Sequence, residues 1–164
     1  FRSMHSKIFQ ITETKVAKDN YLNENTLEQG DGNYYDYCSE IDDNERKLHI
    51  TNLVDNILPK GMFVLVEADV IRYNGGADKW KEEFVAGINE MAKAITTDNC
   101  TLWVGAVYQL EKYLKNPLNT GYQFYMDEQG CSYHAEQSYE FLRTVSQLEP
   151  GTLLYIGGVI DYHF

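Results

Sequence analysis

The chain has only three cysteines, and they stand far apart. Cys38, Cys100 and Cys131 form no Cys-x-x-Cys pair, and their number is odd. This spacing argues against a disulfide framework and against a cysteine zinc site. It fits a reducing compartment, so we expect a cytoplasmic protein.

The sequence also has few basic residues and no long hydrophobic run. It contains 14 Lys and Arg against 25 Asp and Glu, which gives a formal net charge of −11. This charge disfavours direct binding to nucleic acid phosphates or to an anionic membrane surface. The apolar runs fall far short of the roughly twenty residues of a membrane-spanning helix, and no secretory signal is visible at the start. We therefore expect a soluble protein with no membrane contact and no direct nucleic acid contact.

Sequence signatures of nucleotide, metal and hydrolase sites are missing as well. The chain has no Gly-x-x-x-x-Gly-Lys-Ser/Thr loop, no His-Glu-x-x-His and no Gly-x-Ser-x-Gly, and Gly157-Gly158 lies inside an apolar segment instead of opening a helix. The oxygen ligands around Asp31 lack the turn glycine and the closing glutamate of a calcium loop. The four histidines share no local ligand spacing. We expect no cofactor and no metal.

The length and the hydrophobic periodicity predict one folded unit. A chain of 164 residues can bury roughly two-thirds of its unfolded surface without a second domain. We interpret residues 1–3 as the remnant of an expression tag and residues 4–164 as a single domain. Periodicity and turn residues predict strands at 7–14, 62–73, 122–126 and 153–164, and helices at 42–58, 77–95, 102–115 and 132–148.

Strands that alternate with helices of this length indicate an α+β domain, with α/β as the alternative. We expect a layered sandwich of a mixed sheet of about four strands with three to four helices. The Glu67-Ala68-Asp69 interruption predicts a bulge or a tight hairpin, and residues 102–107 can also form a strand. Asp42 and Ser132 are the predicted N-caps of their helices.

Residues 15–33 are rich in Asn, Glu, Asp and Gly and have few apolar side chains. We expect them to form a long surface loop with no core element of its own. A loop of this length in a compact domain is uncommon, so it is either mobile or functional.

The most apolar stretch of its length is 153–164, which predicts a strand inside the sheet, covered on both faces. Its glycine pair, Gly157-Gly158, indicates a bulge or space for a packed ring or a ligand. Strict alternation puts Asp161 and His163 on one face at the strand's end. A carboxylate and an imidazole placed so are a candidate acid–base pair.

Cys38 is the candidate nucleophile, although a small buried core residue is the commoner fate of a lone cysteine. It lies just before a predicted helix, which favours the thiolate, but Asp36 and Glu40 oppose it. The resulting alternative function is a small enzyme that uses Asp161 and His163 with Cys38 or a tyrosine.

Tyrosine is the abundant residue, with 13 copies, and three of them cluster beside the long loop as Tyr34, Tyr35 and Tyr37. A tyrosine combines apolar area with a hydroxyl group, so such clusters often line grooves or interfaces. The leading interpretation is a non-catalytic binding or assembly module that engages a protein partner or its own copy through its acidic surface and this segment. A third interpretation is an acidic decoy that imitates nucleic acid and occupies the groove of a basic protein.

Overall fold

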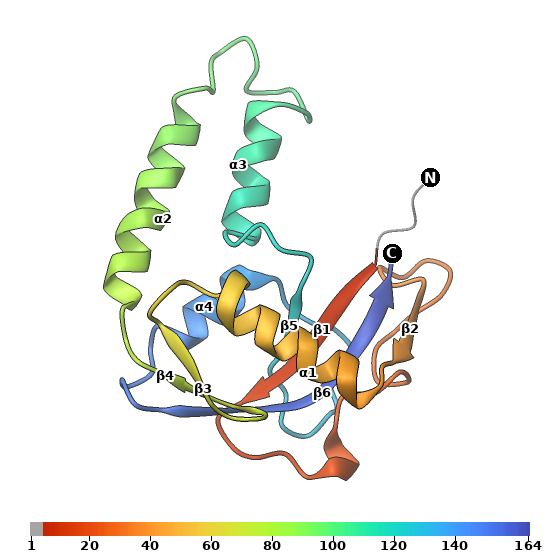
Figure 1. The fold of residues 1–164 in the computed structure, drawn as a ribbon. Helices are drawn as coiled ribbons and strands as arrows, with labels where there is room; N and C mark the ends of the chain where they lie inside the picture. Colours follow the sequence, from red (N-terminus) through yellow and green to blue (C-terminus); the bar gives the residue numbers. More distant parts are fainter. Residues whose placement is uncertain (1–4) are drawn as a thin grey trace.

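A computed structural model describes residues 5–164, and the predicted tag remnant at residues 1–3 lies outside them. Within the described range the chain forms four α-helices and one mixed six-stranded sheet, which agrees with the predicted α+β class (Figure 1). The sheet has more strands than predicted because residues 62–73 form two strands and residues 37–40 add another. No helix of the described part is long and apolar enough to cross a membrane.

The C-terminal strand, β6 (Leu153–His163), lies in the middle of the sheet, as predicted. β1 (His5–Thr12) pairs antiparallel along one edge of β6, and β5 (Gln123–Tyr125) lies parallel to β1. The other edge of β6 pairs with two strands in succession, β4 (Val70–Tyr73) near its start and β2 (Tyr37–Glu40) near its end. β6 accommodates both because it is 11 residues long.

β3 (Phe63–Glu67) forms a hairpin with β4, so the hairpin alternative for residues 67–69 is confirmed. β2 is an unpredicted strand. Its four residues contain no apolar run, and only their pairing with β6 makes them a strand. β2 therefore forms because of β6, a strand that is distant from it in the sequence, and no local pattern predicts it.

A β-bulge at Gly157-Gly158 changes which residues of β6 share a face. Phe9 pairs with Val159 whereas Ile11 pairs with Ile156, so β6 carries one extra residue between these pairs. Strict alternation along β6 would place Ile156 and Val159 on opposite faces, but the bulge brings both into the same hydrophobic core. The bulge is one of the two alternatives predicted for the glycine pair.

The buried side chain of Gln10 holds the bulge and two loops together. Its Oε1 accepts the backbone N–H of Gly158 at 3.0 Å and that of Leu22 at 2.8 Å. Its Nε2 donates to the backbone carbonyls of Asn20 at 3.0 Å and Asp127 at 3.1 Å. A Cβ on Gly158 would clash with the backbone of Leu22, so only glycine permits this close approach.

Each face of the sheet has its own hydrophobic cluster. α1 (Asp43–Asn52) and α4 (Ser138–Val145) cover one face. The chain between β1 and β2 covers the other face, where Leu22 and Leu27 are buried against β6. Residues 15–33 are irregular apart from a short 3-10 turn, and they nevertheless contribute Leu22 and Leu27 to this second cluster.

The helix starts follow local hydrogen bonds. The Asp42 carboxylate accepts the backbone N–H of Glu45 at 2.8 Å, so the predicted N-cap of α1 is confirmed. The predicted cap at Ser132 is wrong, because α4 begins at Ser138. The Asp127 carboxylate accepts the backbone N–H of Cys131 at 3.0 Å and of Ser132 at 2.7 Å, which holds this segment as a loop.

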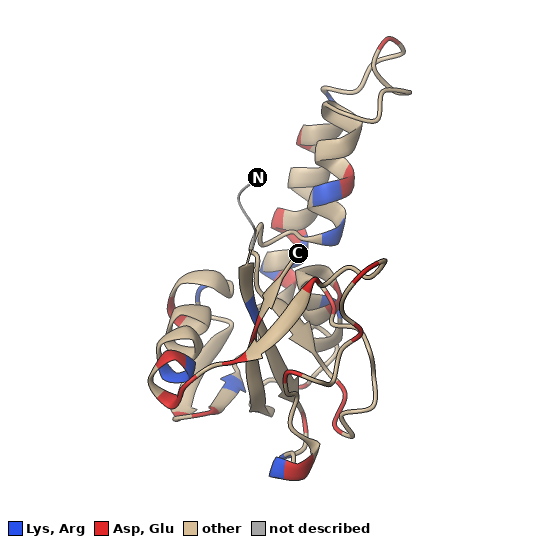
Figure 2. Cartoon of the chain, turned by 90° about the vertical axis from the view of Figure 1, so that its right-hand side faces the viewer, with Lys and Arg blue, Asp and Glu red and all other residues tan. Residues whose placement is uncertain are grey.

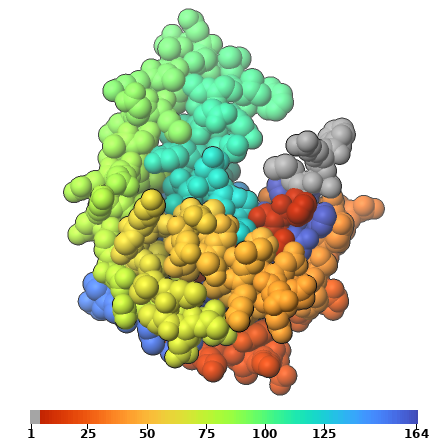
Figure 3. Space-filling model, in the orientation of Figure 1, coloured from red at the N-terminus to blue at the C-terminus, as the bar shows by residue number. Residues whose placement is uncertain are grey.

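Two helices, α2 (Ala77–Ala92) and α3 (Ala106–Lys115), form a hairpin that rises away from the sheet (Figures 1 and 3). We call residues 77–115 the arm. The connection between the helices, 93–105, consists of turns, so the helices predicted over 77–95 and 102–115 are shorter than expected and the strand alternative for 102–107 is not formed. Stacked rings hold the base of the arm, with centroids 5.1 Å apart for Trp80 and Phe84 and 5.4 Å apart for Phe84 and Tyr113.

Candidate functional site

Asp161 and His163 lie on one face at the end of β6, as predicted. His163 Nε2 is 3.3 Å from Asp161 Oδ2. The Asp161 carboxylate also binds the buried Lys7 ammonium, with 3.0 Å between Nζ and Oδ1, and His5 Nδ1 lies 3.7 Å from the same oxygen. Sequence reasoning missed Lys7 and His5, because only the register of β1 against β6 brings them to Asp161. The carboxylate is thus neutralised by an ammonium.

Cys38 does not join this pair. In the sheet register Cys38 lies opposite Tyr162, whose side chain points to the other face from Asp161 and His163. Burial, and secondarily the charge of Asp161, raise the pKa of the Cys38 thiol to about 11. The thiol therefore stays protonated at neutral pH, and the three-residue catalytic set predicted from the sequence is not brought together. Within residues 5–164, no group of three or more His, Cys, Asp or Glu side chains could hold a metal ion.

The three tyrosines predicted to bind a partner have different environments. Tyr35 is 3% exposed, and its hydroxyl donates to Gln123 Oε1 at 2.6 Å. Burial raises the pKa of Tyr35 above its ordinary value, so this residue belongs to the core and is not available to a partner. Tyr37 is 50% exposed, and its ring stacks on His163 with 4.0 Å between centroids. Tyr34 is 53% exposed and is the member of the cluster that lines a pocket.

That pocket, of about 500 Å³, lies between the base of the arm and the end of β6, and we call it the arm-base groove. Figure 3 shows the notch beside α3 on this side of the molecule. One wall is aromatic, because Tyr34 stacks on Phe164 with 5.2 Å between centroids and Phe164 stacks on Tyr162 at 5.6 Å. Tyr108 and Lys112 of α3 form the opposite wall. Amide and small polar residues complete the lining: Asn116, Asn119, Thr120, Gly121, Gln123 and Gln137.

The chemistry of the groove differs from that of the rest of the chain. The sequence has 25 acidic residues, yet none of the described residues that line the groove is acidic. Burial raises the pKa of Tyr34, which keeps its hydroxyl neutral. Ring faces and amide groups together suit a flat, uncharged ligand that can hydrogen bond at its edge.

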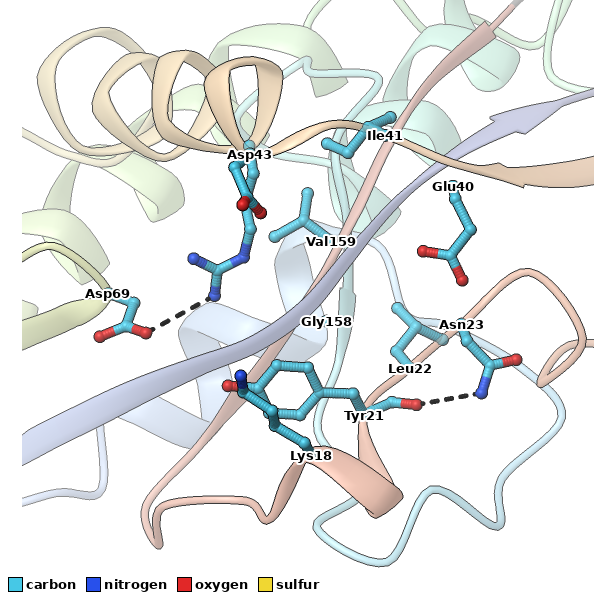
Figure 4. Close-up of a pocket in the computed structure, with 11 residues that line it drawn as sticks. Lys18, Tyr21, Leu22, Asn23, Glu40, Ile41, Asp43, Asp69, Gly158 and Val159 are labelled. Atoms are coloured by element: carbon cyan, nitrogen blue, oxygen red, sulfur yellow. Dashed lines mark hydrogen bonds and ion pairs between the residues drawn. The ribbon is translucent and has the colours of Figure 1, made fainter.

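A second pocket, of about 560 Å³, lies over the β-bulge (Figure 4). The guanidinium of Arg46 lines it and donates to the carbonyls of Ile156 at 3.0 Å and Gly157 at 2.8 Å. It also lies 3.7 Å from Asp69 Oδ2. This cation is already bound to the backbone of the bulge, and we assign it a structural role. The other lining residues are Lys18, Tyr21, Leu22, Asn23, Glu40, Ile41, Asp43, Gly158 and Val159.

The far end of the arm presents an apolar tip. Leu102, Trp103 and Val104 are consecutive and exposed, and Trp103 is 86% exposed. The turn before them is ordered by Asn99, whose side chain accepts the backbone N–H of Thr96 at 2.8 Å and donates to the carbonyl of Ala94 at 2.9 Å. The predicted helix over 102–115 includes Trp103, but α3 begins only at Ala106 and leaves this residue in the exposed turn.

No protein-family model, no curated protein and no solved structure matches this chain.

Proposed function

We propose that this protein is a non-catalytic binding module whose arm-base groove holds an aromatic side chain of a protein partner. The observation that carries the proposal is the lining of the groove, which combines stacked rings and amides and has no acidic side chain among its described residues. Aromatic anchors in such pockets often dominate protein interfaces. Tyr34 supplies a wall of the site, so part of the predicted tyrosine segment takes part in binding.

An amide of tryptophan tests the groove directly. We expect N-acetyl-tryptophanamide to bind with millimolar affinity, the range of a small ligand, and to shift backbone NMR signals around Tyr34, Tyr108 and Phe164 in a saturable way. N-acetyl-alaninamide should shift none of them. Tyr108→Ala should abolish the saturable shifts, because it removes one wall of the groove.

The matched control is Leu48→Ser. Leu48 is an exposed apolar residue on α1 and does not line the groove. This variant should bind the tryptophan amide as the wild type does. Shifts that never saturate, or that map elsewhere in the wild type, would remove the support for an aromatic-anchor site.

The other two interpretations have less support. An enzyme based on Asp161 and His163 is disfavoured because the Asp161 carboxylate is already paired with the Lys7 ammonium. Cys38 also lies on the opposite face of the sheet. For an acidic decoy, the acidic residues lie on several separate loops and helices, with Lys and Arg among them (Figure 2).

We further propose a cytoplasmic location. All three cysteines are free, and Cys100 and Cys131 are exposed. Exposed free thiols persist in a reducing compartment. Alkylation of the protein in intact cells, before lysis, should modify both of them.

A further inference from the structure

The arm carries an exposed apolar tip at one end and the arm-base groove at the other. Among residues 5–164, Trp103 is the most exposed of the large hydrophobic side chains, and its indole N–H is a donor that needs an acceptor once it is buried. The groove offers ring faces for the indole and amide oxygens for its N–H. Its volume of about 500 Å³ lies in the range of pockets that enclose small ligands.

The two features lie at opposite ends of the same arm, so one chain cannot bring them together. α2 alone has 16 residues and is therefore about 24 Å long. Two arms that lie side by side in antiparallel directions, related by a two-fold axis, place the tip of each at the base of the other. Such a contact is self-complementary and closes after two copies.

The charge of the chain favours this arrangement. The arm holds five lysines against six acidic residues, whereas the rest of the chain carries nearly all of the net charge of −11. Figure 2 shows both signs along the helices of the arm. The arm is thus the part of this acidic protein that a second copy can approach without strong repulsion, and the same net charge repels an anionic membrane.

We infer that the occupant of the arm-base groove is Trp103 of a second copy of this chain, so that two copies exchange their arm tips in a symmetric dimer. This inference rests on the proposed function, because it names the partner of the same groove. Leu102 and Val104 flank the indole and pack on the rim.

Sedimentation velocity over a range from low to high micromolar concentration tests the dimer. The wild type should pass from monomer to dimer, and Trp103→Ser should raise the dissociation constant about 30-fold, as loss of a central interface tryptophan does. Tyr108→Ala should raise it similarly from the groove side. Leu48→Ser, an exposed apolar control outside the arm, should dimerise as the wild type does.

A mixture of Trp103→Ser and Tyr108→Ala separates a reciprocal contact from a loss of folding. In the mixed dimer one intact tip meets one intact groove, so the mixture should dimerise more strongly than either variant alone. In a Trp80→Phe background, the fluorescence of Trp103 should shift to shorter wavelength as the concentration rises.

Any one of these results would overturn the inference: a wild type that stays monomeric at high micromolar concentration, a dimer that Trp103→Ser leaves intact, or a mixture no better than its components. A Trp103 emission shift with phosphatidylcholine vesicles and none with concentration would likewise overturn it. Failure here is distinguishable from failure of the proposed function. If the protein is monomeric but its groove still binds the tryptophan amide, only the identity of the partner is wrong.

Discussion

Gln10 and Gly158 are joined by a buried hydrogen bond in which Gln10 Oε1 accepts the Gly158 N–H at 3.0 Å. The two residues are 148 positions apart in the chain. Their contact ties β1, near its C-terminal end, to the β-bulge of the central strand. Because the same oxygen binds the Leu22 N–H, the loop that covers the second core is fixed at this point as well.

Gln10→Leu should strongly destabilise the protein. The substitution conserves size but leaves two buried N–H groups and two carbonyls without their partner. We expect a loss of at least about 3 kcal/mol in the free energy of unfolding, because each unsatisfied buried group costs about 1–3 kcal/mol. Urea denaturation measures this loss. The exposed Gln147→Leu should change stability by less than about 0.5 kcal/mol, and equal effects of the two variants would contradict the role of Gln10.

The Lys7–Asp161 pair should show strong energetic coupling. Asp161→Asn leaves the buried Lys7 ammonium without its counter-charge, so we expect a loss of about 3 kcal/mol in the free energy of unfolding. Lys7→Met added to Asp161→Asn should restore part of that loss. A double-mutant cycle from urea denaturation gives the coupling, and additive effects of the two substitutions would show that the pair is not a unit.

The three cysteines should differ in reactivity. At pH 8 and in the folded state, a thiol reagent should label Cys100 and Cys131, which are exposed, and leave Cys38 unlabelled. Cys38 is buried and its pKa is raised to about 11, so it offers little thiolate. Mass spectrometry counts the labels. Denaturation should release the third thiol, and rapid native labelling of Cys38 would contradict its burial.

Stability should fall at alkaline pH. Burial raises the pKa of Cys38 from 9.0 to about 11 and that of Tyr125 from 10.0 to about 12. As the pH rises above about 9, the unfolded chain loses these protons before the folded one, so each group lowers the free energy of unfolding by up to about 1.4 kcal/mol per pH unit between its two pKa values.

Urea midpoints from pH 8 to pH 11 test this dependence. Tyr125→Phe should flatten the decline above pH 10, because it removes one of the titrating groups. Tyr133→Phe should leave the decline unchanged, since Tyr133 is exposed. A midpoint that stays constant over this range would refute the assignment.

Removal of residues 159–164 should unfold the whole domain. The deletion takes away the pairing of β2 with β6 and the buried side chains of Val159, Ile160 and Tyr162. Circular dichroism should then show no cooperative melting. Deletion of Phe164 alone should preserve cooperative melting, because this residue lies beyond the end of β6. A soluble longer truncation that melts cooperatively would disprove the anchoring role of the strand.

Much of the candidate site could not have been predicted from the sequence. The pairing of Asp161 with His163 follows from a spacing of two residues in one strand, and it was predicted. Lys7 was not, because it meets Asp161 only through the register of two strands from opposite ends of the chain. Likewise, no local pattern shows that Tyr35 points into the core while Tyr34 lines the groove.

The sequence by itself determined the types of all elements except β2, the α+β class, the acidic capping of α1 and the position of the central strand, because these depend on periodicity and on hydrogen bonds within a few residues. Only the tertiary structure decided which side chains meet. The bulge at Gly157-Gly158 shifts the alternation of β6, and the register of β2 sends Cys38 to the face opposite Asp161. The arm-base groove joins α3, Tyr34 and Phe164, which are distant in the chain, so its lining arises only when the sheet and the arm pack together.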